Sequence, residues 1–364
     1  MQQKIPNFPR SVTIFINIIG VVVVFFILKE LQEIFIPLAI AYFLFLIFSP
    51  LNNFFGRRKF PLWLIITLDL LILIIIFGGI STIFINSMYR FGLEMPGYLQ
   101  KLDKIVSSVA TSWGIENPTF TNFNTEKFVK EMNLQALAGS LFSSTFSFMG
   151  TTLFVLFFFI FMATSHKNIH EAFLDRFIST RLHSTSDPDA AQKEEKGLQD
   201  ERALQKTFDD ISGQVQKYTV TKFIISLFTG IIEGGIIWAF GVDFAIIWGV
   251  SIFFFNFIPN IGSFLGLVPP VIMALVQFGS IGKAVLLGSI LAIADNIIGN
   301  LIEPRVFGET LGLNPIVVLI SLLLWGYIWG IPGALLSVPL TSLIKILISR
   351  SDSPDLKFIN KLMG

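Results

Sequence analysis

Cysteine is absent from this 364-residue sequence, histidine occurs three times, and charged residues make up only 14% of it. The absence of cysteine excludes disulfides, thiolate catalysis and cysteine-ligated metals. The histidines, His166, His170 and His183, lie in one polar stretch, which argues against a histidine proton relay inside a membrane. The net charge of +1 gives no electrostatic reason to expect a nucleic-acid partner.

The chain is instead rich in apolar residues. They make up 53% of the chain, 40 residues are Phe, and the mean hydropathy is +0.73. A soluble domain of this size has too little polar surface to cover so much apolar area. The composition therefore predicts an all-α, polytopic integral membrane protein whose first partner is the lipid bilayer.

Five runs approach the length of about 20 apolar residues that a helix needs to cross a bilayer. They are residues 12–28, 34–55, 61–85, 144–165 and 218–240. Lys4 and Arg10 precede the first run, and Arg57–Lys59 follow the second, so the positive-inside rule places the N-terminus and this turn in the cytoplasm. The first run is too long for a signal-peptide core, and the basic tail is also predicted to be cytoplasmic.

The order of these runs predicts six regions. They are N-terminal helices 1–85, an extracytoplasmic amphipathic helical region 86–143, a fourth helix 144–165, a cytoplasmic insertion 166–217, a C-terminal membrane region 218–348 and a cytoplasmic tail 349–364. In the second region Leu99, Leu102, Val106 and Val109 recur at helical spacing. In the insertion, Ser184–Lys196 lacks apolar periodicity, which predicts a flexible linker.

From residue 241 onward the apolar runs are short and interrupted. They cover residues 244–258, 262–278, 283–301, 314–331 and 333–348. Such segments predict broken or re-entrant helices, and the chain as a whole has about eight transmembrane helices, or about ten if each run crosses. The residues assigned to helix breaks and close packing are Pro259, Gly262, Pro304, Pro315, Gly326, Gly330, Gly333 and Pro339.

Charged side chains inside the apolar runs require an explanation, because each costs about 3 kcal/mol or more at the bilayer centre. The predicted substrate or ion pathway consists of Glu233, Asn256, Asn260, Asp295, Asn300, Glu303 and Arg305. The structural alternative is that Asp295 and Glu303 pair with Arg305 while the asparagines cap helix ends. For Asp69, in the third run, we favour a hydrogen-bonded contact between helices.

The spacing of small residues and the positions of the tryptophans are weaker indications of structure than the charged residues inside the apolar runs. Glycines four residues apart, such as Gly230 and Gly234, allow two helix backbones to approach closely. Trp238, Trp325 and Trp329 are predicted to be anchors at the membrane interface rather than platforms for a ligand.

Enzyme signatures are missing from the sequence. It has no Walker A phosphate loop, no Gly-x-Ser-x-Gly elbow and no His-Glu-x-x-His pair. We therefore predict a protein that is not an enzyme and uses no cofactor. An ATP-driven pump is disfavoured, which leaves coupling to an ion gradient or passive conduction.

A series of motifs in the C-terminal third resembles the autoinducer-2 exporter (AI-2E) family of bacterial transporters. The motifs are Pro259-Asn-Ile-Gly262 followed by Pro269 and Pro270, then Asn300-Leu-Ile-Glu303-Pro304-Arg305, Leu311-Gly-Leu-Asn-Pro315, and Trp325-Gly326-x-x-Trp329-Gly330-x-x-Gly333-x-x-x-x-x-Pro339. Their order and spacing are specific over about residues 215–348. The N-terminal part matches in layout, although an insertion as long as 166–217 is less typical.

The resemblance implies an inner-membrane transporter or permease that assembles as a homo-oligomer such as a pentamer. Family members are described either as exporters of autoinducer-2 or as exchangers of sodium or lithium for protons. The leading hypothesis is a secondary transporter that exports a small, autoinducer-2-like solute through a site among the broken C-terminal helices. The termini are then both cytoplasmic.

Two alternatives remain open on the sequence alone. A monovalent cation/proton antiporter would use Asp295, Glu233 or Glu303, and neutralising them would abolish pH-dependent cation flux. A non-transporting membrane scaffold would instead depend on its polar loops, and Asp295→Asn would have no effect. Flux into proteoliposomes separates these readings.

Overall fold

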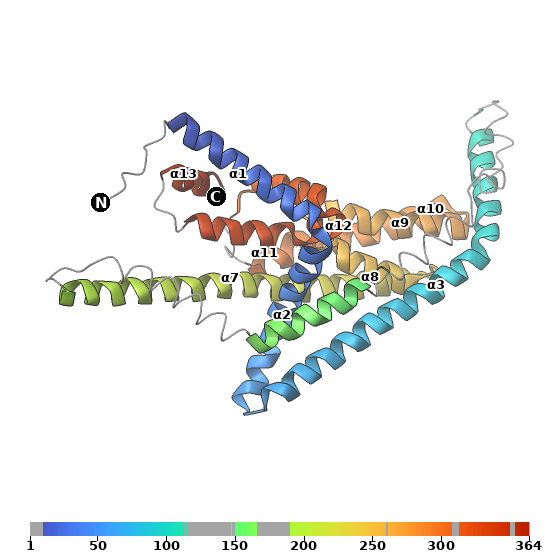
Figure 1. The fold of residues 1–364 in the computed structure, drawn as a ribbon. Helices are drawn as coiled ribbons and strands as arrows, with labels where there is room; N and C mark the ends of the chain where they lie inside the picture. Colours follow the sequence, from blue (N-terminus) through green and yellow to red (C-terminus); the bar gives the residue numbers. More distant parts are fainter. Residues whose placement is uncertain are drawn as a thin grey trace.

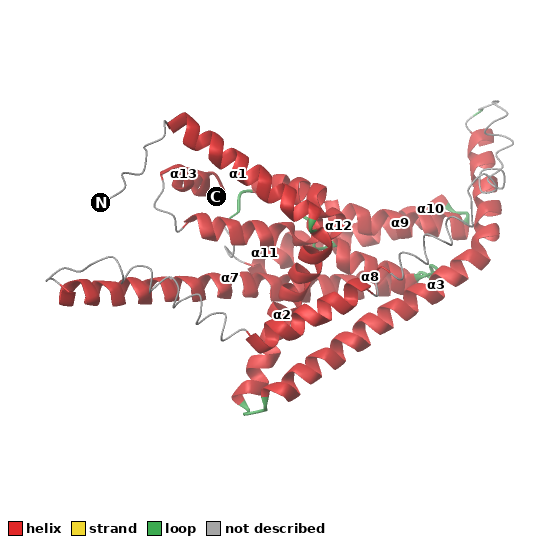
Figure 2. Cartoon of the chain, in the orientation of Figure 1, coloured by secondary structure: helices red, strands yellow, loops and turns green. Residues whose placement is uncertain are grey.

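The computed structural model describes residues 10–112, 150–165, 190–259, 261–307, 313–349 and 354–363, with Gly114 and Ser147 as isolated positions. All regular secondary structure in these ranges is helical (Figure 2). The predicted fold class, an all-α polytopic membrane protein, is confirmed. The three histidines, Asn260 and most of residues 113–149 lie outside the described residues.

The N-terminal helices are long and follow the apolar runs of the sequence. Helix α1 covers Arg10–Glu30, α2 covers Gln32–Arg57 and α3 covers Leu62–Ser112. With 51 residues, α3 is about 75 Å long, more than twice the thickness of a hydrocarbon core. The third span therefore continues without a break into the amphipathic stripe that the sequence placed in a separate outer region. Figure 1 shows α3 running to the end of the molecule opposite both termini.

The Gly150–Ser165 helix packs against α2 and α3 in a mainly apolar core. Ala41 and Phe48 of α2 meet Leu73 of α3 and Phe159 of the Gly150–Ser165 helix, and all four are buried. The rings of Phe48 and Phe159 pack edge to face, with centroids 5.8 Å apart. These helices form the N-terminal bundle.

Helix α7 covers Ala190–Ala239, and its first half projects beyond the bundle on the side of both termini (Figure 1). Residues 190–196, expected to belong to a flexible linker, are helical, so that part of the prediction is wrong. The stretch is rich in Ala, Glu, Lys and Gln, which are strong helix formers. Adding a residue to an existing helix is far easier than starting one, so the membrane span carries the helix outward.

Five helical elements come directly after α7 in the described chain, and the last three of them continue directly into one another. Helix α8 covers Ala245–Phe255, α9 covers Ile261–Phe278 and α10 covers Ile281–Asn296. A π-helix, η1, covers Ile297–Ile302, and the short α11 covers Glu303–Phe307. The α8–α9 turn is so tight that a Cβ atom on Gly262 would overlap the carbonyl oxygen of Phe255. On the other side of α8, a Cβ atom on Gly230 would lie 2.7 Å from the carbonyl oxygen of Gly249.

Helix α12, Pro315–Ser349, is two helices joined at Gly330, whose φ of 63° and ψ of −140° are accessible only to glycine. A Cβ atom on Gly333 would overlap the carbonyl oxygen of Trp325, so the two halves fold back closely on each other. Within α12, Gly330 is the position with non-helical dihedrals, whereas Pro332 and Pro339 are accommodated inside the second half. Gly326 makes only an ordinary 3.9 Å approach to Ala334.

Trp325 and Trp329 lie in the core between α12, α1 and α2, with 4% and 5% of their surface exposed. The prediction that they are interfacial anchors is wrong, because each indole N–H is satisfied inside the protein. Trp325 Nε1 donates to Thr341 Oγ1 at 3.2 Å, and Trp329 Nε1 donates to the Leu28 carbonyl at 2.9 Å. Trp238, by contrast, is 75% exposed.

A last helix, α13, covers Pro354–Met363 and returns to the start of α12, where the Asn314 N–H donates to the Met363 carbonyl at 2.9 Å. Six of the described helices are long and apolar enough to cross a membrane. They contain Gln32–Arg57, Leu62–Ser112, Gly213–Ala239, Ile261–Phe278, Ile281–Phe307 and Pro315–Lys345, and Gly150–Ser165 and Ala245–Phe255 are shorter apolar helices. Both termini lie at the same end of the molecule (Figure 1).

Candidate functional site

A small polar cavity lies at the α8–α9 turn, where that turn meets α7 and α10. Its space is enough for about one water molecule. It is lined by Thr229, Glu233, Ile252, Asn256, Gly262, Ser263, Gly266 and Asp295. The break between α8 and α9 thus brings polar groups from four helices to one point inside an otherwise apolar region.

Glu233 is the most deeply buried charged residue of this cavity, with 2% of its surface exposed. Gly230 and Gly234 on either side of it let α8 approach the α7 backbone, as the glycine spacing predicts. In the part of the chain that the structure describes, Oε1 of Glu233 is buried without a hydrogen-bond partner. Asp295 faces it from α10, near enough for the two carboxylates to repel each other. The cavity therefore carries two acidic groups, at least one with an unused oxygen.

Asn256 stands at the C-terminal end of α8 and links the turn to α7. Its Nδ2 donates to Ser226 Oγ at 3.0 Å and to Thr229 Oγ1 at 3.5 Å. Both amide hydrogens are directed at α7, which leaves the amide oxygen as an acceptor. Of the predicted pathway residues, Glu233, Asn256 and Asp295 are thus brought together, while Asn260 lies outside the described residues.

The other described residues of the predicted pathway, Asn300, Glu303 and Arg305, do not line the cavity. Glu303 Oε1 accepts a hydrogen bond from Lys222 Nζ at 2.6 Å, and these side chains are only 25% and 8% exposed. Arg305 is exposed and forms no ion pair within the described residues, so the structural alternative in which it pairs with Glu303 is wrong. Asn300 is also exposed and donates to Asn296 Oδ1 at 2.6 Å on the outer face of the π-helix. Glu303 therefore belongs to an ion pair between α7 and α11.

Several polar residues of α7 were not identified from the sequence. Lys222, Ser226 and Thr229 precede Glu233 at intervals of four, three and four residues, and all are buried. This spacing puts the four side chains on one face of the helix. A search for polar rather than apolar periodicity in the fifth span would have found the stripe.

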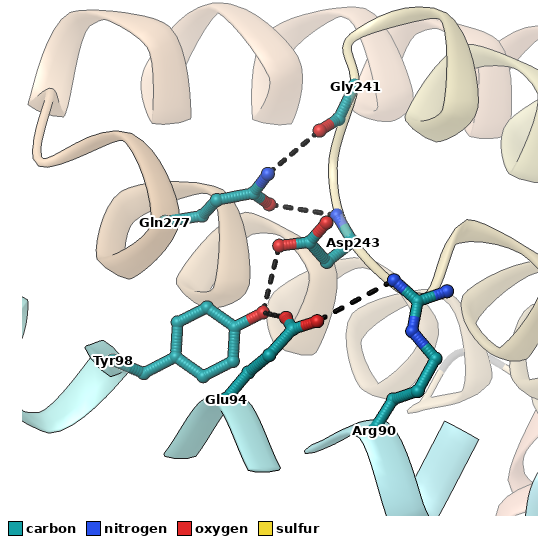
Figure 3. A network of polar contacts seen from close by, with 6 residues as sticks. All are labelled: Arg90, Glu94, Tyr98, Gly241, Asp243 and Gln277. Carbon is teal, nitrogen blue, oxygen red and sulfur yellow. Dashed lines mark hydrogen bonds and ion pairs between the residues drawn. The ribbon is translucent and has the colours of Figure 1, made fainter. Parts of the chain in front are cut away.

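A second polar network joins the far end of α3 to the turns that follow α7 and α9 (Figure 3). The Tyr98 hydroxyl lies within hydrogen-bond distance of Glu94 and of Asp243 Oδ2, the latter at 2.8 Å. Glu94 also pairs with Arg90 at 3.6 Å. The Asp243 N–H donates to Gln277 Oε1 at 2.8 Å, and Gln277 Nε2 donates to the Gly241 carbonyl at 2.9 Å. Three elements far apart in sequence are thereby tied together.

Asp69 is the buried acidic group of the N-terminal bundle, with 0% of its surface exposed. Asn52 of α2 lies beside it. The hydrogen bond expected between the helices is not formed, because neither Asp69 oxygen nor Asn52 Oδ1 has a hydrogen-bond partner within the described residues. Asp69 is separate from the cavity, whose lining comes from α7 to α10.

The fold and the cavity define a class of protein. Polar residues at a helix break, between the helices of a polytopic membrane protein, are typical of membrane transporters. The family model described as AI-2E family transporter matches residues 14–352. The chain therefore belongs to the AI-2E transporter family.

Similar proteins from bacteria agree with this assignment. The chain is 31% identical over 340 residues to the "Putative transport protein" of Haemophilus influenzae, covering 92% of each chain. It is 28% identical over 344 residues to "Putative transport protein YhhT" of Escherichia coli K12, covering 92% of this chain and 89% of the relative. It is also 40% identical over 149 residues to "AI-2 transport protein TqsA" of Escherichia coli K12, covering 41% and 42%.

Proposed function

We propose that this protein is a secondary transporter whose transport site is the cavity between Glu233 and Asp295, and that a proton or a monovalent cation binds there. The observation that carries the proposal is the meeting of two carboxylates from α7 and α10 at the α8–α9 turn. A buried carboxylate without a partner is costly unless a cation or a proton compensates its charge. Glu233 is such a group, and the Asp295 carboxylate beside it adds a second negative charge to the cavity.

The chemistry and size of the cavity favour a small cation. None of the described residues that line it is basic, and Lys222 is already paired with Glu303. Thr229, Ser263 and Asn256, whose side chains carry oxygen atoms, also line the cavity, and hard cations prefer oxygen ligands. Space for about one water molecule accepts a proton or a dehydrated ion but excludes a polyhydroxylated solute in this conformation.

The second candidate is export of a small, autoinducer-2-like solute coupled to that ion. It is favoured by the 40% identity to the AI-2 transport protein TqsA, which covers less than half of either chain. This function requires the cavity to enlarge when the α8–α9 turn moves relative to α7 and α10. The two candidates share the same carboxylates and differ in what else crosses the membrane.

We also propose a location in the inner membrane, with both termini in the cytoplasm, and assembly as a homo-oligomer. The basic residues at the N-terminus, after α2 and in the C-terminal tail support this orientation. The position of both termini at one end of the molecule is consistent with it (Figure 1).

Flux measurements in proteoliposomes test the proposal. The purified protein is reconstituted, a pH gradient is imposed, and internal pH is followed on addition of Na⁺, Li⁺ or K⁺, with labelled autoinducer-2 uptake measured in parallel. We expect cation-dependent proton movement that Glu233→Gln and Asp295→Asn each abolish. Arg305→Gln, a change of an exposed charge outside the cavity, serves as the control and retains flux.

Each outcome has a defined meaning. Autoinducer-2 uptake that depends on the same two carboxylates, without cation exchange, favours the second candidate. Flux no greater than in empty liposomes under every condition, or flux that survives both neutralisations, contradicts the proposed site.

A further inference from the structure

Two polar contacts bracket the cavity along α7, one toward each end of the membrane-spanning part. Lys222 precedes Glu233 by eleven residues, or about 16 Å of helix, on the side of both termini. Asp243 follows the end of α7, which lies about 9 Å beyond Glu233, on the opposite side. The cavity thus sits between two points at which α7 is fastened to other elements.

The first set of contacts lies on the side of the termini and is called the termini latch. It consists of the Lys222–Glu303 ion pair and the packing of Tyr218 against Phe307. The ion pair is 2.6 Å long, and the two rings have centroids 5.0 Å apart. It joins α7 to α11, the segment directly after the π-helix that follows Asp295. A π-helical turn is less regular than an α-helix and often marks a functional position. Separation of α11 from α7 would expose the cavity toward the termini.

The second set of contacts, on the side of the α3 end, consists of Tyr98 with Asp243, supported by Gln277 (Figure 3). It is called the arm latch, the arm being the part of α3 beyond the third span. It joins the part of α3 beyond the third span to the α7–α8 turn and to the end of α9. Lys101 Nζ adds a hydrogen bond to the Gln277 carbonyl at 2.8 Å. Beneath the latch, Tyr98 belongs to the same buried cluster as Ile252, which lines the cavity. The latch is thus connected to the lining of the cavity through this buried core.

We propose that the termini latch and the arm latch are the two gates of the transport site, each closing the cavity toward one side of the membrane. This inference rests on the proposed transport site and names the residues that control access to it. Both latches are closed in the structure. Alternating access then requires one latch to open while the other stays closed, so that the cavity is never open to both sides.

The absence of cysteine in the chain makes a direct test possible. A single thiol is introduced by Ser263→Cys in the cavity lining, and its reaction with a membrane-impermeant maleimide is measured separately from each face in oriented membrane vesicles. Ser108→Cys on α3 and Gln214→Cys on α7, both exposed, report which face the reagent has reached.

We expect S263C to react slowly from both faces in the parent protein. Tyr98→Phe should raise the rate about tenfold from the face of the α3 end alone, because the link to Asp243 is lost. Lys222→Met combined with Glu303→Gln should raise it about tenfold from the face of the termini alone. Tyr89→Phe and Lys217→Met, matched changes of exposed residues on α3 and α7, should leave the rates unchanged.

The double exchange Lys222→Glu with Glu303→Lys is the control for misfolding of the termini-latch variant. It restores an ion pair with reversed charges and should therefore restore slow reaction of S263C from the face of the termini. Unchanged rates in both latch variants, or a rise at the same face in both, overturn the proposal. Labelling does not depend on flux. Loss of the side-specific labelling pattern therefore contradicts the gates, whereas flux that survives Glu233→Gln contradicts the proposed function.

Discussion

The N-terminal and C-terminal halves of this chain are suited to the same lipid environment but are built from different kinds of helix. The helices α1 to α3 are long and uninterrupted, and their core with the Gly150–Ser165 helix is apolar except for Asp69 and Asn52. The helices α7 to α12 break at the α8–α9 turn, at the π-helix and at Gly330. Polar side chains with little exposure gather at the α8–α9 turn, beside the π-helix, and in α12, where the buried ones are Ser321, Ser337, Thr341 and Ser342.

The difference follows from backbone hydrogen bonding. An unbroken helix satisfies its own N–H and C=O groups and needs nothing from its neighbours. A broken helix leaves such groups free at its ends. At the α8–α9 turn, close packing at glycines and the hydrogen bond from Asn256 to Ser226 hold the broken ends against α7. The same polar groups can bind an ion, which is why a transport site belongs in the second half. The predictions below test this contrast in order of expected effect.

The largest effect is expected at the α8–α9 turn. Gly262→Ala places a methyl group against the Phe255 carbonyl oxygen, where neither backbone can yield without opening the turn. We expect the free energy of unfolding to fall by at least about 3 kcal/mol, measured by SDS titration in mixed micelles.

Gly235→Ala, in α7, is the matched control, because a Cβ atom there meets nothing within 4 Å. It should change the free energy of unfolding by no more than about 1 kcal/mol. Equal effects at the two positions would show that the turn is not packed as described.

A smaller effect is expected for the ion pair between α7 and α11. Lys222→Met leaves the half-buried Glu303 carboxylate without its partner and should cost about 2 kcal/mol of unfolding free energy. Adding Glu303→Gln removes the stranded charge and should recover more than half of that loss. Strictly additive losses in the same unfolding assay would mean that the two side chains do not interact.

These residues also show how far the sequence could predict the molecule. The helices over residues 12–28 and 34–55 were predictable because runs of about 20 apolar residues leave few alternatives. The breaks at Pro259–Gly262 and near Gly330 were predictable from proline and glycine. The partner of Glu303 was not, because the choice of Lys222 over Arg305 depends on how helices 81 residues apart are rotated against each other. The Tyr98–Asp243 contact, across 145 residues, has the same origin.

The smallest effect, and one of opposite sign, is expected in the N-terminal bundle. Asp69→Asn replaces a fully buried carboxylate that lacks a hydrogen-bond partner among the described residues with a neutral amide that can donate to Asn52 Oδ1. We expect the free energy of unfolding to rise by about 1 kcal/mol. A loss of stability would indicate that the Asp69 charge is compensated in the native protein.

The central claim is that transport requires Glu233, the buried carboxylate of the C-terminal half, and does not require Asp69, the buried carboxylate of the N-terminal half. Proton-coupled cation flux in matched proteoliposomes of Glu233→Gln and Asp69→Asn tests it most directly, because each variant removes one buried negative charge from a membrane helix. We predict flux at background for Glu233→Gln and at parental rate for Asp69→Asn. Background flux for Asp69→Asn together with parental flux for Glu233→Gln would contradict the account.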